Sequence, residues 1–199
     1  MLETIRKEIK PYARVTGQSP GSLKLDVDGL VKECPIFKGC FFESMRLYTA
    51  GSSYKKVLQD LTLTEGDEDA TTFGKPGPQT YHIKAGDFLV IPGATLQTDP
   101  RLWKDPSAFN PERYIIPDEK DPKKVKVDSL HLFAFGGGHS VCKGRIFAER
   151  EVLIFVAGLI SVWDFTPTDG TWVIPKKWYN GTGSGNPKSV LRVKMSRRS

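Results

Sequence analysis

The feature that most constrains the fold of this chain is a glycine-rich loop that leads directly into a long apolar segment. The loop contains three consecutive glycines and a cysteine, in the order Phe135-Gly-Gly-Gly-His-Ser-Val-Cys-Lys-Gly144. Glycines allow backbone conformations that other residues avoid, so such a loop can lie close to a flat ligand. The following residues, 144–163, predict a helix. Cys142 then lies near the positive end of its dipole, where a thiolate is favoured. The loop therefore indicates a metal–thiolate bond rather than a disulfide.

The remaining cysteines and histidines do not complete another kind of metal site. The 199 residues include three cysteines and three histidines, and the sequence contains no C-x-x-C or C-x-x-C-H motif. This composition argues against a disulfide framework, a structural zinc site and covalently attached c-type haem. His139 and Cys142 have the i, i+3 spacing of a shared metal site, but no second pair accompanies them.

Charge and hydropathy leave several partners open. The chain has 29 basic and 23 acidic residues, for a net charge of +6. A moderate basic excess suits an acidic protein, an anionic membrane surface or nucleic acid, and equally a solvated basic surface. No nucleic-acid-binding motif accompanies it, so we expect no nucleic-acid partner. The longest apolar run, residues 152–163, is too short to span a bilayer. We therefore expect no membrane anchor in this chain, and a soluble, cytoplasmic location for the chain alone.

Periodicity predicts a mixed α+β fold, mainly helical with small β-sheets. We expect helices over 2–10, from Pro35 to about Thr49, and over 144–163, the last of them buried. Alternating patterns predict strands over 54–63 and 81–91, with short strands after 164. The acidic and then Gly/Pro-rich segment 64–79 predicts an exposed, mobile insertion.

Three motifs together resemble the C-terminal part of the cytochrome P-450 family. The loop is similar to the family's haem-binding pattern F-x-x-G-x-(basic)-x-C-x-G, which Phe135, Gly138, Cys142 and Gly144 match. Ser140 stands where the family usually has an Arg or His that contacts a haem propionate, and the adjacent His139 is a candidate substitute. Glu43-Ser-Met-Arg46 resembles the family's E-x-x-R motif, and Pro111-Glu-Arg-Tyr114 resembles its P-E-R motif.

The resemblance implies a role for each matched residue. Cys142 would be the proximal ligand of the iron of haem b, and Glu43, Arg46 and Arg113 would form a buried charge network that fixes the core around the loop. Lys55 lies where relatives often have an arginine that touches a propionate; a lysine on a strand edge is the alternative. The full set of cofactor-binding residues that the resemblance implies is Phe135, Gly136, Gly138, His139, Cys142, Gly144 and Lys55.

The function implied by the resemblance is that of a haem-thiolate monooxygenase, which activates O2 at the iron and inserts one oxygen atom into an apolar substrate. We expect residues 1–199 to be an incomplete, haem-binding C-terminal portion, since the family's distal acid–alcohol motif is absent. No catalytic residue is therefore assigned, and the chain alone is expected to be inactive. A complete relative would use an NADPH-dependent reductase at the cytoplasmic face of the endoplasmic reticulum membrane. The alternatives are a non-catalytic fragment or interaction module, and a haem-thiolate isomerase or dehydratase.

Overall fold

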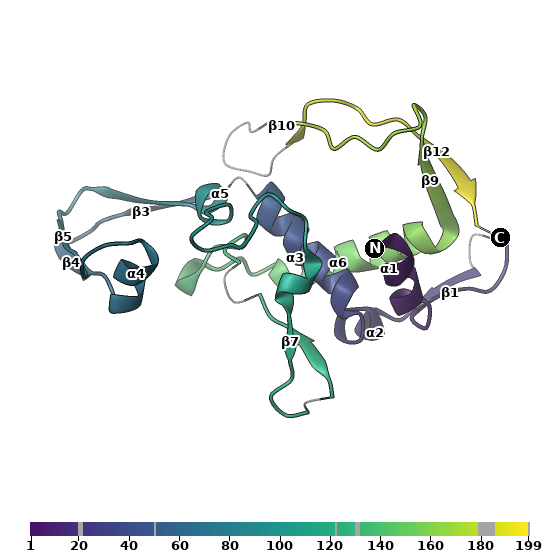
Figure 1. Ribbon diagram of the computed structural model, residues 1–199, viewed down its shortest axis with the longest axis horizontal. Helices are drawn as coiled ribbons and strands as arrows, with labels where there is room; N and C mark the ends of the chain where they lie inside the picture. Colours follow the sequence, from purple (N-terminus) through teal and green to yellow (C-terminus); the bar gives the residue numbers. More distant parts are fainter. Residues whose placement is uncertain (20–21, 50, 122, 130–131, 179–185, 199) are drawn as a thin grey trace.

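The computed structural model describes residues 1–19, 22–49, 51–121, 123–129, 132–178 and 186–198. Its longer helices gather together in an extended molecule, and pairs of strands project from them (Figure 1). The helices of the described residues are α1 (Leu2–Ile9), α2 (Val27–Lys32), α3 (Pro35–Tyr48), α4 (Asp67–Thr72), α5 (Gly93–Leu96) and α6 (Arg145–Val162), with the 3-10 turns η2 (Pro111–Tyr114) and η3 (Gly138–Ser140). The predicted helices over 2–10, 35–49 and 144–163 are thus confirmed to within a residue or two.

The strands pair only two by two, and every described pair is antiparallel. The pairs are β1 (Ala13–Val15) with β2 (Leu23–Leu25), β3 (Ser52–Lys56) with β6 (Phe88–Pro92), β4 (Leu61–Thr64) with β5 (Thr80–Ile83), β7 (Ile115–Pro117) with β8 (Val125–Val127), β9 (Trp163–Pro167) with β12 (Val193–Arg197), and β10 (Lys177–Trp178) with β11 (Asn186–Pro187). The predicted strand over 54–63 is in fact two strands, because the chain leaves the pairing between Lys56 and Leu61. The predicted strand region over 81–91 is likewise two strands, β5 and β6, which residues 84–87 separate.

Helix α3 is the central element, and its start is held by another helix. Pro35 occupies the first helical turn, where its missing N–H costs nothing. The next two backbone N–H groups, of Ile36 and Phe37, donate to the Glu8 carboxylate of α1 at 3.0 and 2.8 Å. These donors have no partner within their own helix, so Glu8 satisfies them and docks α1 against α3.

The core lies where α1, α2, α3 and α6 meet. Its buried apolar residues are Ile5, Ile9, Ala13, Leu30, Cys34, Phe37, Phe41, Phe42, Trp103, Tyr114, Leu153 and Ala157. Helix α6 ends against α1, because the Arg6 guanidinium donates to the carbonyls of Ile160 and Trp163, both at 3.2 Å. This contact satisfies carbonyls that the end of α6 leaves without a helical partner.

One expectation about burial needs correction. Helix α6 is not a buried helix: only Leu153 and Ala157 are buried, and Phe147 and Phe155 are 69% and 66% exposed. Its apolar side chains point to several sides, and the core covers only one of them. The segment 64–79 is exposed for the most part, but it contains α4, whose Ala70 is buried. An ion pair between Lys75 and Glu65 joins two parts of this segment, and the Tyr81 hydroxyl of β5 donates to Glu65 at 2.9 Å.

Candidate functional site

The glycine-rich loop folds back on itself between Phe133 and Cys142. Gly136 and Gly138 have φ of +73° and +60°, a region that side chains other than glycine rarely adopt. The Gly136 N–H donates to the Phe133 carbonyl at 2.9 Å, and the Cys142 N–H donates to the Phe135 carbonyl at 3.0 Å. The two glycine conformations thus bring Cys142 back beside the start of the loop.

Cys142 differs from the other two cysteines in its exposure. Its thiol is exposed, whereas Cys34 is buried and Cys40 is half-buried. Burial, reinforced by the negative charge of Glu8, raises the pKa of Cys34 to about 12 and that of Cys40 to about 11. Those two remain neutral thiols at physiological pH, so Cys142 is the cysteine suited to bind a metal.

Cys142 lies just before the helix rather than inside its first turn. Helix α6 begins at Arg145, with Gly144 as its N-cap residue. The Cys142 carbonyl accepts hydrogen bonds from the Arg145 backbone N–H and guanidinium at 3.4 and 3.3 Å. The thiol is therefore close to the positive end of the α6 dipole, as the sequence suggested, and two cationic side chains, Lys143 and Arg145, are exposed beside it.

A pocket of about 350 Å³ lies between the glycine loop and the paired strands β3 and β6. Its walls combine apolar side chains with glycine backbone, and one cation reaches it. The lining residues that matter here are Lys55, Ile91, Leu96, Phe133, Gly136 and Gly137. Such a mixture suits a largely apolar ligand with an anionic group.

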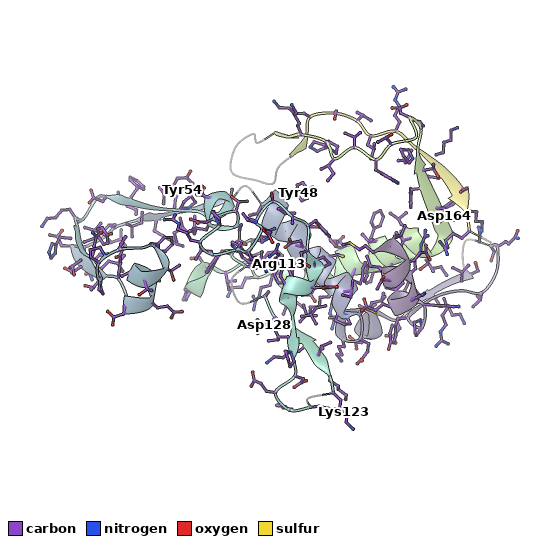
Figure 2. The ribbon with its side chains drawn as sticks, viewed as in Figure 1. Tyr48, Tyr54, Arg113, Lys123, Asp128 and Asp164 are labelled. Carbon is purple, nitrogen blue, oxygen red and sulfur yellow. The ribbon has the colours of Figure 1, made fainter. Side chains whose placement is uncertain are left out.

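A fully buried ion pair lies on α3, the helix whose Phe41 contacts Phe135 of the glycine loop. The two oxygens of Glu43 accept from Nη2 and Nε of Arg46 at 2.8 and 2.9 Å, and both side chains are 0% exposed. Arg113 Nε donates to Glu43 at 3.1 Å, so the structure brings together the three residues of the expected network. Figure 2 labels Arg113 beside the central helices.

The pKa of Glu43 follows from these contacts. Burial alone raises the pKa of a carboxyl, but hydrogen bonds from Arg46, the Asn110 N–H and Arg113 outweigh it and hold the pKa of Glu43 below its usual range. Glu43 is therefore ionised, and the guanidinium groups of Arg46 and Arg113 balance its negative charge. A buried charge cluster of this kind orders the structure around it only when every member is hydrogen-bonded.

Arg46 extends the network to the chain between α5 and η2. Its Nη1 donates to the carbonyls of Gln97 and Pro106 at 2.7 and 2.9 Å, and its Nη2 to that of Ala108 at 3.2 Å. Its guanidinium also lies 5.1 Å from the centre of the Trp103 ring. Arg113 donates to the carbonyls of Lys104 and Asp105 at 2.9 and 3.3 Å, so the two guanidinium groups together satisfy carbonyls of this irregular segment.

Sequence reasoning missed two members of this network. The Tyr114 hydroxyl donates to Glu43 at 3.1 Å, and the Asn110 N–H donates to it at 2.9 Å. Burial and the Glu43 charge raise the pKa of Tyr114, which keeps its hydroxyl protonated. Tyr114 could have been found from its position directly after Arg113. The Asn110 donor is a backbone N–H, which almost every residue has, so the sequence could not indicate it.

The other expected residues are distributed around the loop. Phe135 is half-buried and stacks on Phe41 of α3, with ring centres 6.5 Å apart. Lys55 Nζ lies 2.9 Å from Ser140 Oγ, which joins β3 to the loop. His139 is exposed, and its side chain makes no hydrogen bond or ion pair to any described residue.

Comparison with known proteins places this loop and network in a family. The profile of the Cytochrome P450 family matches residues 28–194, a range that contains α3, η2, the glycine loop and α6. The chain belongs to the cytochrome P450 family. It has the mixed α+β fold of that family, since it superimposes on a solved cyanobacterial structure, "Retinoic acid bound cyanobacterial CYP120A1", with a TM-score of 0.68 and 25% identity. The superposition covers 99% of this chain and 38% of that chain.

Curated relatives come from plants, fungi and animals. The "(S)-N-methylcanadine 1-hydroxylase CYP82Y1" of Papaver somniferum is 30% identical over 85% of this chain and 28% of its own length. The "Cytochrome P450 monooygenase 1" of Gibberella fujikuroi is 26% identical over 98% of this chain and 40% of its own length. The chain thus spans well under half the length of the relatives it matches. No helix in the part of the chain that the structure describes is long and apolar enough to cross a membrane.

Proposed function

We propose that this chain forms the thiolate-bearing side of a haem-thiolate monooxygenase site, with Cys142 as the iron ligand and haem b as the cofactor. The observation that carries the proposal is the exposed Cys142 thiol at the end of the glycine loop. Gly136 and Gly138, both with positive φ, fold this loop back, and Gly136 lines the pocket. Membership of the family supports the same assignment.

The residues present fit a flat, largely apolar cofactor with carboxylate substituents. Gly136 and Gly138 have no side chain to keep a porphyrin away from the backbone, and their positive φ values exclude most replacements. Phe133 and Leu96 supply apolar contact in the pocket, and Lys55 supplies a positive charge. When bound, the haem would supply the activation of O2 and the transfer of one oxygen atom to an apolar substrate.

This chain's own residues would bind the iron and shield the bond. Cys142 would supply the thiolate, while Phe135, held against Phe41, would exclude water from the sulfur and so tune its donation to the metal. The Glu43–Arg46–Arg113 network would hold the loop in position without taking part in the chemistry. The exposed cations Lys143 and Arg145 would face an acidic, electron-donating partner, which for a complete relative is an NADPH-dependent reductase at the endoplasmic reticulum membrane.

The test is the absorption spectrum of the purified chain with added haem, reduced and exposed to CO. We expect a strongly red-shifted Soret band, which would report that a thiolate binds the iron. The variant Cys142→Ala should abolish that band, because no other thiol of the chain is exposed. The matched control is Cys40→Ala, which removes a half-buried thiol from α3 and should leave the band in place.

Two outcomes would contradict the proposal. A well-folded wild-type chain that shows no red-shifted band has no thiolate-ligated haem, and the chain is then a non-catalytic module. A band that persists in Cys142→Ala assigns the ligand to another residue. Circular dichroism on each variant separates loss of the ligand from loss of the fold.

A further inference from the structure

A second cavity lies at the C-terminal end of α6, the end away from the glycine loop. Its volume is about 810 Å³, and α1, β1 and the last turn of α6 contribute to its walls. Figure 1 shows these three elements next to one another. No described residue lines both this cavity and the pocket beside the glycine loop. An inference about this cavity is therefore independent of the proposed haem site.

The cavity is lined by more basic than acidic side chains. The described residues that line it include one carboxylate, Glu3, and five cations, Arg6, Lys7, Lys10, Arg14 and Arg198. Two of the cations are neutralised, since Arg6 pairs with Glu3 at 2.8 Å and with Asp164 at 2.5 Å, and Arg198 pairs with Asp164 at 2.9 Å. The other three cations form no ion pair with a described residue. They leave the cavity with three positive charges that the described part of the chain does not balance.

The placement of these cations is unfavourable unless an anion lies among them. Lys7 and Lys10 are three residues apart at the end of α1, so their side chains share one side of the helix. Arg14 of β1 is directly opposite Lys24 of β2, and like charges in that position repel each other. A bound anion would relieve both repulsions.

Arg14 is oriented for such an anion by a contact with its own backbone segment. Its Nε donates to the Pro11 carbonyl at 2.8 Å, and Pro11 also lines the cavity. Nη1 and Nη2 of Arg14 donate to no described residue, so they can bind two oxygens of one phosphate. A phosphate monoester carries nearly two negative charges at neutral pH, which balances three cations better than a single carboxylate does.

The cavity also offers apolar surface. Ile9, Ala13 and Ile160 line it, and Val15 at its edge is 43% exposed. A bare inorganic anion would leave this surface in contact with water, whereas an ester could cover it with its apolar group. The volume lies within the range of small-molecule sites.

We propose that this cavity binds a phosphate monoester with an apolar chain, with Lys7, Lys10 and Arg14 around the phosphate and Val15 and Ile160 against the chain. The same chemical group occurs in soluble phosphate esters and in phosphatidic acid of a membrane. The experiment therefore includes one measurement for each source.

The experiment is a calorimetric titration of the full chain with hexyl phosphate. We expect it to bind about tenfold more tightly than inorganic phosphate, because burial of roughly two methylene groups gives that factor. It should also bind about tenfold more tightly than hexanoate, which has a similar chain and a single charge. Arg14→Gln should weaken hexyl phosphate binding by about tenfold. Val15→Thr should weaken it by about threefold and leave the affinity for inorganic phosphate unchanged.

The matched control is Lys123→Gln, which removes one positive charge from the exposed segment between β7 and β8. Figure 2 labels Lys123 well apart from Asp164, which pairs with two lining residues of the cavity. This change should alter the affinity for hexyl phosphate by less than about twofold, because it changes the net charge without touching the site. Circular dichroism on each variant verifies that the fold is retained.

The second measurement is co-sedimentation with phosphatidylcholine vesicles, prepared with and without phosphatidic acid. Binding that requires phosphatidic acid and is lost in Arg14→Gln supports the proposal and assigns the site to a lipid head group. Binding of hexyl phosphate without such vesicle binding supports the proposal and assigns the site to a soluble ester.

Three results would overturn the proposal. A folded wild-type chain that binds no hexyl phosphate, or binds it no more tightly than hexanoate, has no phosphate site here. Equal affinity in wild type and Arg14→Gln excludes this cavity as the place of binding. An equal loss in Lys123→Gln and Arg14→Gln means that net charge alone explains the binding. None of these results affects the assignment of Cys142, because the two cavities share no described residue.

Discussion

Glu43 shows how much a single buried carboxylate determines in this chain. It accepts hydrogen bonds from Arg46, Arg113, Tyr114 and the Asn110 N–H, so four groups from two regions of the sequence share one anion. None of these groups reaches the pocket beside the glycine loop. The network therefore lies outside the lining of that pocket and holds α3 against residues 97–114.

The first prediction concerns the loss of this charge. Glu43→Gln keeps the shape of the side chain but leaves two guanidinium groups near a neutral amide in a dry environment. We expect the free energy of unfolding to fall by about 3–5 kcal/mol, the usual cost of breaking a buried ion pair on one side. The measurement is urea unfolding followed by circular dichroism. The control is Glu112→Gln, an exposed residue of the same motif region, for which a change above about 0.5 kcal/mol would contradict the argument.

The second prediction concerns pH. Because the folded pKa of Glu43 is depressed, its contribution to stability is fully present above the unfolded pKa of about 4.3 and is lost as pH falls through the lower folded value. We expect wild type to lose stability steeply below about pH 4. Glu43→Gln should lose less over the same interval, since it has no proton to take up at this position. Equal slopes of unfolding free energy against pH in both proteins would refute this.

At the scale of elements, α3 and η2 approach so closely that only glycine fits between them. A Cβ at Gly39 would lie 2.4 Å from the Pro111 carbonyl oxygen, which is backbone and cannot turn aside. We expect Gly39→Ala to destabilise the chain by about 1–3 kcal/mol, because the two elements must separate. Gly77→Ala, where a Cβ meets nothing within 4 Å, is the control and should change stability by less than about 1 kcal/mol. Thermal unfolding of the two variants measures the difference.

The elements also show what could be predicted from the sequence and what could not. Helix α3 was predictable because Pro35 marks its start and its apolar residues repeat along one face. The exposure of α6 was not predictable. Its apolar residues lie on several sides, so the sequence does not indicate which side packs against the core. In the site, the resemblance of two motifs to those of a known family implied that Glu43, Arg46 and Arg113 meet. The bond between Lys55 and Ser140 depends on how a distant hairpin docks, so spacing along the chain could not predict it.

At the scale of the whole molecule, the core leaves many large apolar side chains exposed. Large apolar residues are exposed on α6, on β6 and in the segment that follows β9, among them Phe147, Phe155, Phe88, Trp172 and Ile174. A surface of this kind is an interaction site or a liability in solution. We expect the isolated chain to bind a hydrophobic fluorescent dye under native conditions and to unfold over a broad thermal transition. Weak dye binding together with a sharp, cooperative transition would contradict this expectation.

The carboxylate of Glu8 has a consequence for the order in which the molecule can become structured. The first free backbone N–H groups of α3 donate to the Glu8 side chain of α1. The start of α3 is therefore fully hydrogen-bonded only when α1 is docked against it. The two helices therefore belong to one cooperative unit, and the amides of Ile36 and Phe37 open to solvent exchange whenever α1 departs. Departure of α1 would in this way expose the first turn of the helix that carries Glu43.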